Sequence, residues 1–188
     1  NPLGLAEFTL SRKDPAYVGL AKEIQKAEKE RVQGGHPCQA FPYLKEVMGT
    51  IKEQFAEVNH TNTGFGSTIF AVKPGDGSAR EQAASCQKVL GGWANIANEY
   101  ATKRYRSNLI NWGMLPFLIP EGELPFTNKD FLFFPGIRSA VKEKAEEITG
   151  YTVKSDSMKA FTVRLGDLTD EERQIILDGC LINYNRVK

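Results

Sequence analysis

The feature that most constrains the fold is an alternation of short apolar runs and helical segments between residues 67 and 119. The expected elements are a strand at 67–72, a helix at about 79–90, a strand at 93–97, a helix at about 100–112 and a strand at 114–119. This is the rhythm of βαβ units, in which a helix returns the chain so that the next strand runs parallel to the last. The sequence therefore predicts an α/β fold with a parallel or mixed central sheet flanked by helices.

The regions on either side of this alternation differ from each other. The expected elements there are helices at 17–32 and 43–58, strands at 130–134, 151–153 and 160–165, and a last helix from 169 to a glycine at 179. Asp14 and Pro15 suit the N-cap and first position of the first helix, and Thr169 and Glu172 have capping-box spacing. We therefore expect a helical lead-in segment at 1–60, packed on a domain at 61–188.

Composition limits the classes of partner. The chain has 24 Lys and Arg against 23 Asp and Glu, a net charge of +1, so charge gives no reason to expect nucleic acid or an anionic membrane as the main partner. The longest apolar runs are far shorter than the roughly 20 residues of a membrane span, and no signal peptide opens the chain. Three scattered cysteines, without a CxxC pair, favour a reducing compartment, and we expect a cytoplasmic protein. The chain begins with Asn1 rather than Met, which suggests a fragment or a processed product.

The loop at residues 75–82 has the composition of an anion site. Gly75 and Gly77 permit a backbone path that side chains would obstruct, and Ser78 is placed to cap the helix that follows. The unpaired N–H groups of a helix start, together with the guanidinium of Arg80, suit a carboxylate. The alternative is an ordinary cap with a solvated arginine. The loop does not match the known phosphate-binding motifs: GKS or GKT is absent, and the GxGxxG pattern is not met because position 80 is arginine.

Three motifs in order resemble one family. Residues 75–84, GDGSAREQAA, resemble the G-x-G-S-S-R-E-H-A-A signature of the swivelling domain of the aconitase superfamily. Residues 90–92, LGG, match a helix-ending L-G-G, and residues 106–116, RSNLINWGMLP, resemble R-S-N-L-x-x-x-G-x-L-P. The resemblance is close over about 69–118, extends less closely to the C-terminus and is poor before residue 60. The stretch is also similar to a bacterial branch of aconitase-like hydratases.

The resemblance implies a C-terminal aconitase-type swivelling β/β/α domain of a hydro-lyase that acts on a di- or tricarboxylic hydroxy acid. By position, Ser78 corresponds to the base that takes the proton α to a carboxylate, and Arg80 to a carboxylate-binding arginine. Ala79 and Gly77 would contribute backbone contacts to the substrate. A serine can act as a base only where its alkoxide is stabilised, and the helix start and Arg80 are the local groups for this.

The resemblance also implies a 4Fe-4S cluster held by three cysteines of other domains, two of them in a CxxC. Cys38, Cys86 and Cys180 do not reproduce that arrangement, so we expect no metal in this chain and buried, apolar roles for these residues. We expect cluster-bearing partner domains on the same polypeptide or on a large subunit, and an inactive domain in isolation. Non-catalytic roles are expected for His36 and His60.

Departures from the family pattern leave alternatives open. Ala79 replaces a second serine, Gln82 and Tyr105 each stand where relatives have histidine, and a further substrate arginine has no match before residue 60. The loss of these polar groups is consistent with a different acid substrate, with weak activity or with a degenerate enzyme. The rival hypotheses are a regulatory or RNA-binding relative, to which the basic residues 103–106 could contribute, and a generic anion-binding domain. A solvated helix face is the simpler interpretation of 103–106, and Trp93 and Trp112 are expected in the core.

Overall fold

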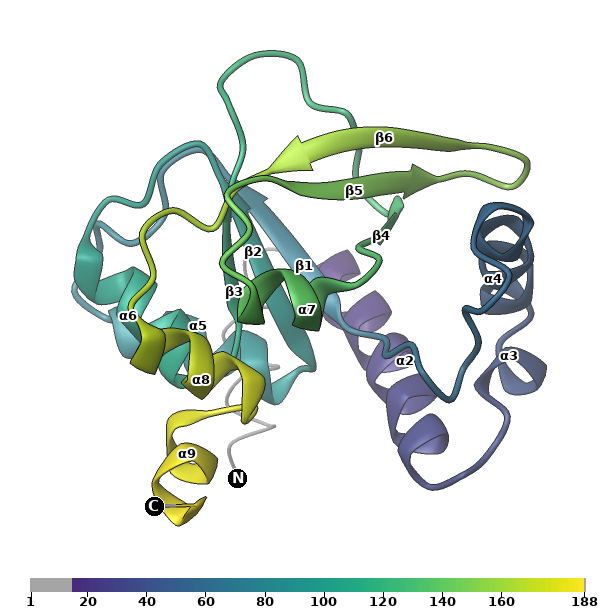
Figure 1. Cartoon of the computed structure of the whole chain (residues 1–188), viewed down its shortest axis with the longest axis horizontal. Coiled ribbons are helices and arrows are strands. Elements are labelled where there is room, and N and C mark those ends of the chain that lie inside the picture. The colour runs from purple at the N-terminus through teal and green to yellow at the C-terminus, as the bar shows by residue number, and fades with distance from the viewer. Residues whose placement is uncertain (1–14, 188) are drawn as a thin grey trace.

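The computed structural model describes residues 15–187, and Figure 1 shows two sheets with helices around them. The helices are α2 (Pro15–Val32), α3 (Pro37–Ala40), α4 (Pro42–Gln54), α5 (Arg80–Val89), α6 (Lys103–Asn111), α7 (Ile137–Lys142), α8 (Asp170–Leu177) and α9 (Leu181–Val187). The strands are β1 (Ser67–Ala71), β2 (Gly92–Ala97), β3 (Leu115–Leu118), β4 (Phe131–Phe133), β5 (Ile148–Val153) and β6 (Met158–Val163). The α/β class expected from the sequence is confirmed. The expected N-cap, Asp14, lies outside the described residues.

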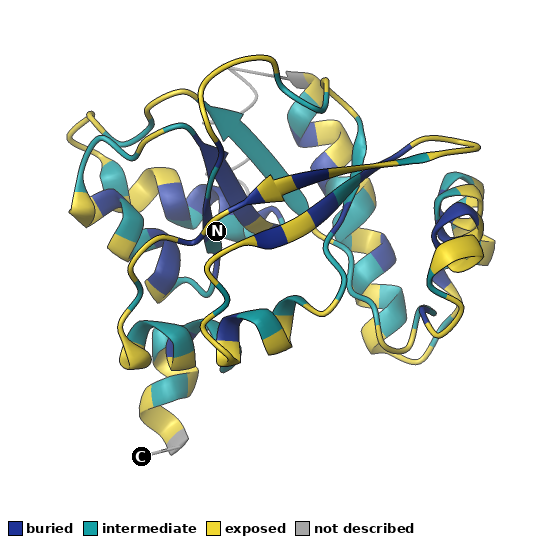
Figure 2. Ribbon diagram, turned by 45° about the horizontal axis from the view of Figure 1, so that its top comes forward, coloured by how far each residue is buried: buried dark blue, intermediate teal, exposed yellow. Residues whose placement is uncertain are grey.

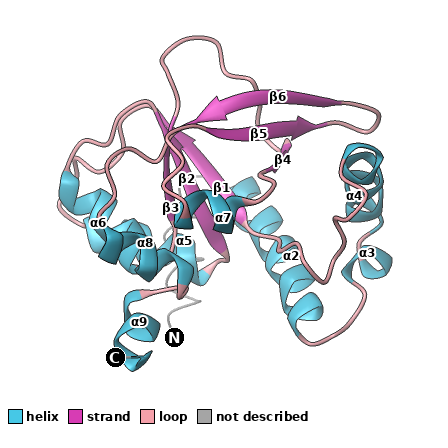
Figure 3. Cartoon of the chain, in the orientation of Figure 1, coloured by secondary structure: helices cyan, strands magenta, loops and turns pink. Residues whose placement is uncertain are grey.

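The alternating region forms a parallel sheet in the order β1-β2-β3. Phe70 pairs with Ile96, and Ile96 pairs with Phe117, so all three strands run in the same direction. Helices α5 and α6 connect these strands, as the βαβ rhythm predicted, and the three strands lie together at the centre of the molecule (Figure 3). The parallel sheet is therefore confirmed.

The last strands form a second, antiparallel sheet in the order β4-β5-β6. The two sheets meet where Leu118, at the end of β3, exchanges backbone hydrogen bonds of 2.6 and 2.9 Å with Arg164, just after β6. The β5–β6 hairpin extends from this junction across the top of the view in Figure 1. Residues 15–187 thus form two sheets that meet at this bridge, rather than a single central sheet.

The main core lies between the two sheets. Side chains of β2 and β3, such as Ile96 and Phe117, pack against Phe161 and Val163 of β6 and Val141 of α7. Figure 2 shows the buried residues concentrated along these strands. In β2 the side chains alternate between the two faces of the sheet, so Asn95, next to Ile96, lies on the side of α6, where it contacts Tyr105.

The lead-in helices pack on different parts of the fold. Val18 and Ala21 of α2 pack against Cys86 and Leu90 at α5, and Gln25 donates a 2.7 Å hydrogen bond to the carbonyl of Val89. Helix α4 packs through its apolar face on the antiparallel sheet, in a cluster that consists of Met48, Ile51, Val58, Phe133 and Val153. The division of the chain at residue 60 stays a prediction.

The ends of several elements agree with the sequence. The capping box of Thr169 and Glu172 is present at α8, and Gly34 and Gly179 adopt φ angles of 83° and 91° after α2 and α8. Helix α4 ends earlier than expected, at Gln54, because Phe55 leaves the helix and packs its ring on Phe133 and Tyr151.

Two expectations about burial need correction. Trp93 is 40% exposed rather than in the core, and its ring lies over Gly64 and Gly66, where added Cβ atoms would be 2.1 and 2.5 Å from ring carbons. Trp112 does pack on a core cluster as a partly buried residue. Cys86 is buried, whereas Cys38 and Cys180 are partly exposed.

Candidate functional site

The candidate site lies at the carboxyl edge of the parallel sheet, where the segments that follow β1, β2 and β3 meet. Backbone hydrogen bonds join the first two of these segments: Glu99 donates to Val72 at 3.1 Å and Ala101 to Pro74 at 2.9 Å. An exposed ion pair of 3.1 Å joins Lys73 to Glu99. The first residues of the loop between β1 and α5 (72–74) are therefore held in place by the loop before α6.

Gly75 is the residue on which this attachment depends most. Its φ angle is +100°, and a Cβ atom at this position would be 2.5 Å from Cβ of Tyr105 and 2.6 Å from its Cγ. The Thr102 hydroxyl donates a 3.2 Å hydrogen bond to the Gly75 carbonyl and also accepts the Tyr105 amide as the N-cap of α6. The expectation that a side chain would obstruct the backbone at Gly75 is confirmed.

Tyr105 is itself held in place by buried side chains. Its hydroxyl accepts hydrogen bonds from Asn95 Nδ2 at 2.7 Å and from Gln87 Nε2 at 3.2 Å. Burial raises the pKa of Tyr105, so this phenol stays neutral. Sequence reasoning noted Tyr105 only as a departure from the family pattern. The signal available in the sequence was Asn95, a polar residue within an apolar strand, because a buried amide needs a polar partner such as the Tyr105 hydroxyl.

The tip of the loop is open to solvent. Gly77, Ser78 and Ala79 are all exposed, and an added Cβ at Gly77 would meet nothing within 4 Å. The expectation that a side chain would obstruct the path at Gly77 is therefore wrong. The N-cap of α5 is Ala79 rather than Ser78, so the predicted capping role of Ser78 is also wrong. Helix α5 therefore begins at Arg80, one residue later than a cap at Ser78 would give.

This shift leaves the start of α5 without a side-chain cap. Ala79 has no side-chain oxygen, and the N-cap makes no side-chain hydrogen bond. The Ser78 hydroxyl has no hydrogen-bond partner among residues 15–187. The unpaired N–H groups of a helix start bind anions, and the helix dipole adds to this preference.

Arg80 is the most informative side chain of the site. It is partly buried in the first turn of α5, and its Nε is buried without a hydrogen-bond partner in the described part of the chain. No ion pair of its guanidinium occurs between residues 15 and 187. Buried polar groups are almost always paired in native proteins, so an orphan charged donor needs an explanation. Ser78, Ala79 and Arg80 thus bring a hydroxyl, backbone N–H groups and a cation into three consecutive positions at the start of α5.

The described residues contain no group of three His, Cys, Asp or Glu side chains that could hold a metal ion. The three cysteines form no disulfide, and burial raises the thiol pKa of Cys38 and Cys86. These residues therefore do not fit an iron–sulfur cluster.

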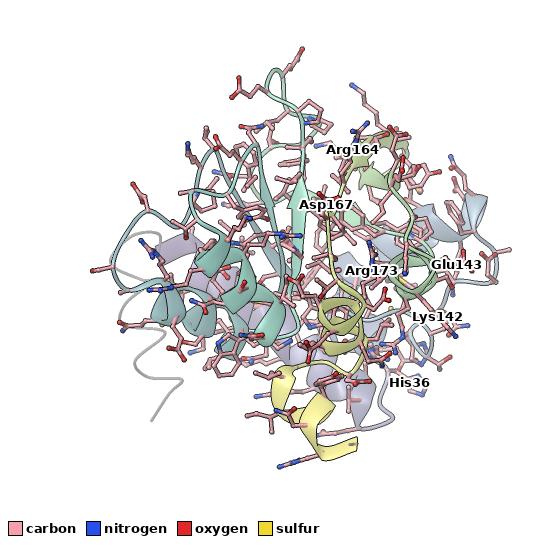
Figure 4. The ribbon with its side chains drawn as sticks, turned by 60° about the vertical axis from the view of Figure 1, so that its left-hand side comes forward. His36, Lys142, Glu143, Arg164, Asp167 and Arg173 are labelled. Carbon is pink, nitrogen blue, oxygen red and sulfur yellow. The ribbon has the colours of Figure 1, made fainter. Side chains whose placement is uncertain are left out.

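The basic residues 103–106 are not a continuous charged surface. Lys103 and Arg104 are exposed, but Tyr105 is buried, and Arg106 donates a hydrogen bond of 2.5 Å to the carbonyl of Asp167. The hydrogen bond between Arg106 and Asp167 joins α6 to the segment before α8. Asp167 is labelled in that segment in Figure 4.

Comparison with known proteins identifies the region of the site. Residues 45–122 match the family described as the aconitase C-terminal domain. This part of the chain is similar to aconitase C-terminal domains. The match includes the candidate loop and the 106–116 motif, and it begins at residue 45, within helix α4.

Two aconitate hydratases are similar to the chain. That of Streptomyces viridochromogenes is 37% identical over 87 residues, which cover 44% of this chain and 9% of that protein. That of Rickettsia bellii is 26% identical over 158 residues, which cover 81% of this chain and 17% of that protein. The matched residues of this chain thus span a small part of the length of these curated relatives. Among solved structures, 3-isopropylmalate dehydratase from Methanocaldococcus jannaschii matches with a TM-score of 0.43 and 25% identity, over 72% of this chain and 74% of that one.

The length and apolar character of the described helices show whether one of them could cross a membrane. Between residues 15 and 187, none of them combines the length and the apolar character that a membrane crossing requires.

Proposed function

We propose that this domain supplies part of the active site of an aconitase-type hydro-lyase that acts on a di- or tricarboxylic hydroxy acid. The proposal rests on the aconitase C-terminal domain family match and on one feature of the loop: the unpaired, partly buried guanidinium of Arg80 beside an uncapped helix start. Both groups are electropositive and neither has a partner within the described structure, so a carboxylate is the ligand that suits them.

Arg80 is proposed to bind a substrate carboxylate. A guanidinium offers a planar pair of donors that matches the two oxygens of a carboxylate, which a lysine could not offer. Backbone N–H groups near Ala79 and Gly77 would donate hydrogen bonds to a second carboxylate oxygen. Ala79 lacks the hydroxyl of the second serine in the family motif, so the acid bound here would make one polar contact fewer on this side.

Ser78 is proposed to move the proton. In dehydration a C–H bond α to a carboxylate breaks, its electron pair forms the C=C bond, and the hydroxyl on the neighbouring carbon leaves. The proton goes to Oγ of Ser78, and hydration returns it. Positive charge from the α5 helix start and Arg80 would stabilise the serine alkoxide, which a hydroxyl in water could not form at neutral pH.

The rest of the site is proposed to lie on partner domains, either on the same polypeptide or on a large subunit. A 4Fe-4S cluster on those domains would act as the Lewis acid for the leaving hydroxyl. Because the residues described here do not fit a cluster, we expect the isolated domain to bind carboxylates weakly and to have no hydratase activity.

The carboxylate proposal is testable on this chain alone. We expect citrate or cis-aconitate to shift the amide resonances of residues 78–83 in a ¹H–¹⁵N NMR titration. In Arg80→Gln the apparent affinity should fall at least about tenfold, since a hydrogen bond to a charged group contributes about 1.5–3 kcal/mol.

Arg104→Gln is the matched control, because Arg104 is exposed at the start of α6 and belongs to no part of the proposed site. It should bind the acids as the parent does. Equal losses in the Arg80 and Arg104 variants would show that binding follows net charge, and an unchanged Arg80 variant would contradict the assignment.

A further inference from the structure

A second cluster of polar side chains lies far in sequence from the loop that follows β1. His36 and His60 are the two histidines of the whole chain, and their rings contact each other with centroids 5.3 Å apart at an interplanar angle of 69°. They come from different loops, one before α3 and one between α4 and β1. His36 is exposed and is labelled in Figure 4, and His60 is partly exposed, so both rings are accessible from solvent.

The backbone under His36 is fixed by local structure. His36 is the N-cap of α3 and is followed by the buried Pro37, and its carbonyl accepts hydrogen bonds from the amides of Gln39 and Ala40. Before it, Gly35 donates a 2.9 Å hydrogen bond to the carbonyl of Glu30 at the end of α2. The backbone position of His36 is therefore set before any ligand arrives.

The backbone under His60 is fixed as firmly. Asn59 and Asn62 close the turn around it: the Asn59 side chain accepts the amide of Thr61 at 2.8 Å, and the Asn62 side chain accepts the amide of Asn59 at 2.9 Å. The Asn62 side chain also donates to the carbonyl of Glu57 at 2.8 Å. Preorganised ligands lose little conformational entropy on binding, which raises the affinity of a site with few ligands.

We propose that His36 and His60 form a binding site for a divalent late transition-metal ion such as Zn²⁺, with water completing the coordination. Imidazole is a preferred ligand of such ions. With metal–nitrogen bonds of about 2 Å and tetrahedral angles, the centres of two ligating rings lie about 5 Å apart. The observed ring separation of 5.3 Å has this spacing. The carboxylate of Glu30 lies beside Gly35, the residue before His36, on a surface that Lys26 and Lys29 also line.

Calorimetric titration of the chain with ZnCl₂, without an affinity tag, tests this site. We expect one ion to bind per chain, and we expect the ring-proton NMR signals of both histidines to change together. Each of His36→Gln and His60→Gln should lower the affinity at least about tenfold, since even outer-shell changes cost a metal site about 10–100-fold. Because His36 is exposed, its variant should keep the fold, and circular dichroism checks this directly.

Cys38→Ser is the matched control, because Cys38 is the nearest thiol in sequence and packs against the cluster around α4. It should bind zinc like the parent. The site is ruled out if no zinc binds, if either histidine variant binds as tightly as the parent, or if the cysteine variant alone abolishes binding. Since neither histidine lies in the segments that form the carboxylate site, this outcome is independent of the proposed hydro-lyase function.

Discussion

Alanine substitution at the two glycines of the 75–82 loop should give opposite results. In Gly75→Ala the new side chain must adopt a φ of +100° and would place Cβ 2.5 Å from Cβ of Tyr105. Backbone strain of this kind costs about 1–3 kcal/mol, and overpacking against a buried neighbour costs about 1–3 kcal/mol more. The free energy of unfolding should therefore fall by at least about 2 kcal/mol, which lowers Tm by roughly 4–8 °C in a chain of this size.

Gly77→Ala is the control, because an added Cβ there meets nothing within 4 Å and the φ of Gly77 lies outside the positive range. Its unfolding free energy should stay within about 0.5 kcal/mol of the parent. Urea unfolding of both variants, with parallel thermal melts, gives the comparison. If the two alanine variants are equally destabilised, or if Gly75→Ala is not destabilised, then Gly75 is not held against Tyr105 while Gly77 is open to solvent, and this description of the loop is refuted.

Three further changes test the supports of the fold. Tyr105→Phe removes the acceptor of two buried amides and should cost about 1–3 kcal/mol in urea unfolding; no loss would mean that these amides find other acceptors. Although burial alone would raise it, hydrogen bonds from Lys154 and Thr127 hold the pKa of Asp130 below its usual 3.8. Its contribution to stability should thus be present above about pH 4 and be lost as the pH falls through that lowered pKa, and Asp130→Asn should remove this dependence; a variant that keeps the full acid dependence would contradict it. Thr169→Ala opens the capping box with Glu172 and should cost about 1 kcal/mol, with faster amide exchange in the first turn of α8 and not elsewhere.

Local patterns were sufficient to predict the parallel sheet. Each βαβ unit between residues 67 and 119 is short, and its strand and helix signals lie next to each other in the sequence. The separate antiparallel sheet was not predicted as such, because β4 pairs with β5 across an intervening helix and no local signal specifies that pairing. Helices α7 and α9 were missed for another reason: with six and seven residues they are too short to establish a helical period.

The loop shows why site geometry goes beyond sequence. Gly75 and Gly77 look equivalent in the motif, and only the packing of Tyr105, thirty residues further on, makes one of them indispensable. In the same way, Ser78 is a better N-cap residue than Ala79, but the structure places Ala79 at the N-cap of α5. The residue types predicted an anion site, whereas only the structure shows that Ser78 and Arg80 have no side-chain hydrogen-bond partner among residues 15–187.

Proton transfer by Ser78 is tested most directly by measuring turnover. In a protein that carries this domain together with the cluster-bearing domains proposed above, with the cluster reconstituted anaerobically, hydration of cis-aconitate and related unsaturated acids would be compared between parent, Ser78→Ala and Ser107→Ala. Ser107 is an exposed serine of α6 and should be replaceable without loss. We predict that Ser78→Ala lowers kcat by about 10²- to 10⁴-fold, the usual contribution of a general base. Full kcat in Ser78→Ala, with an active parent, would contradict the account.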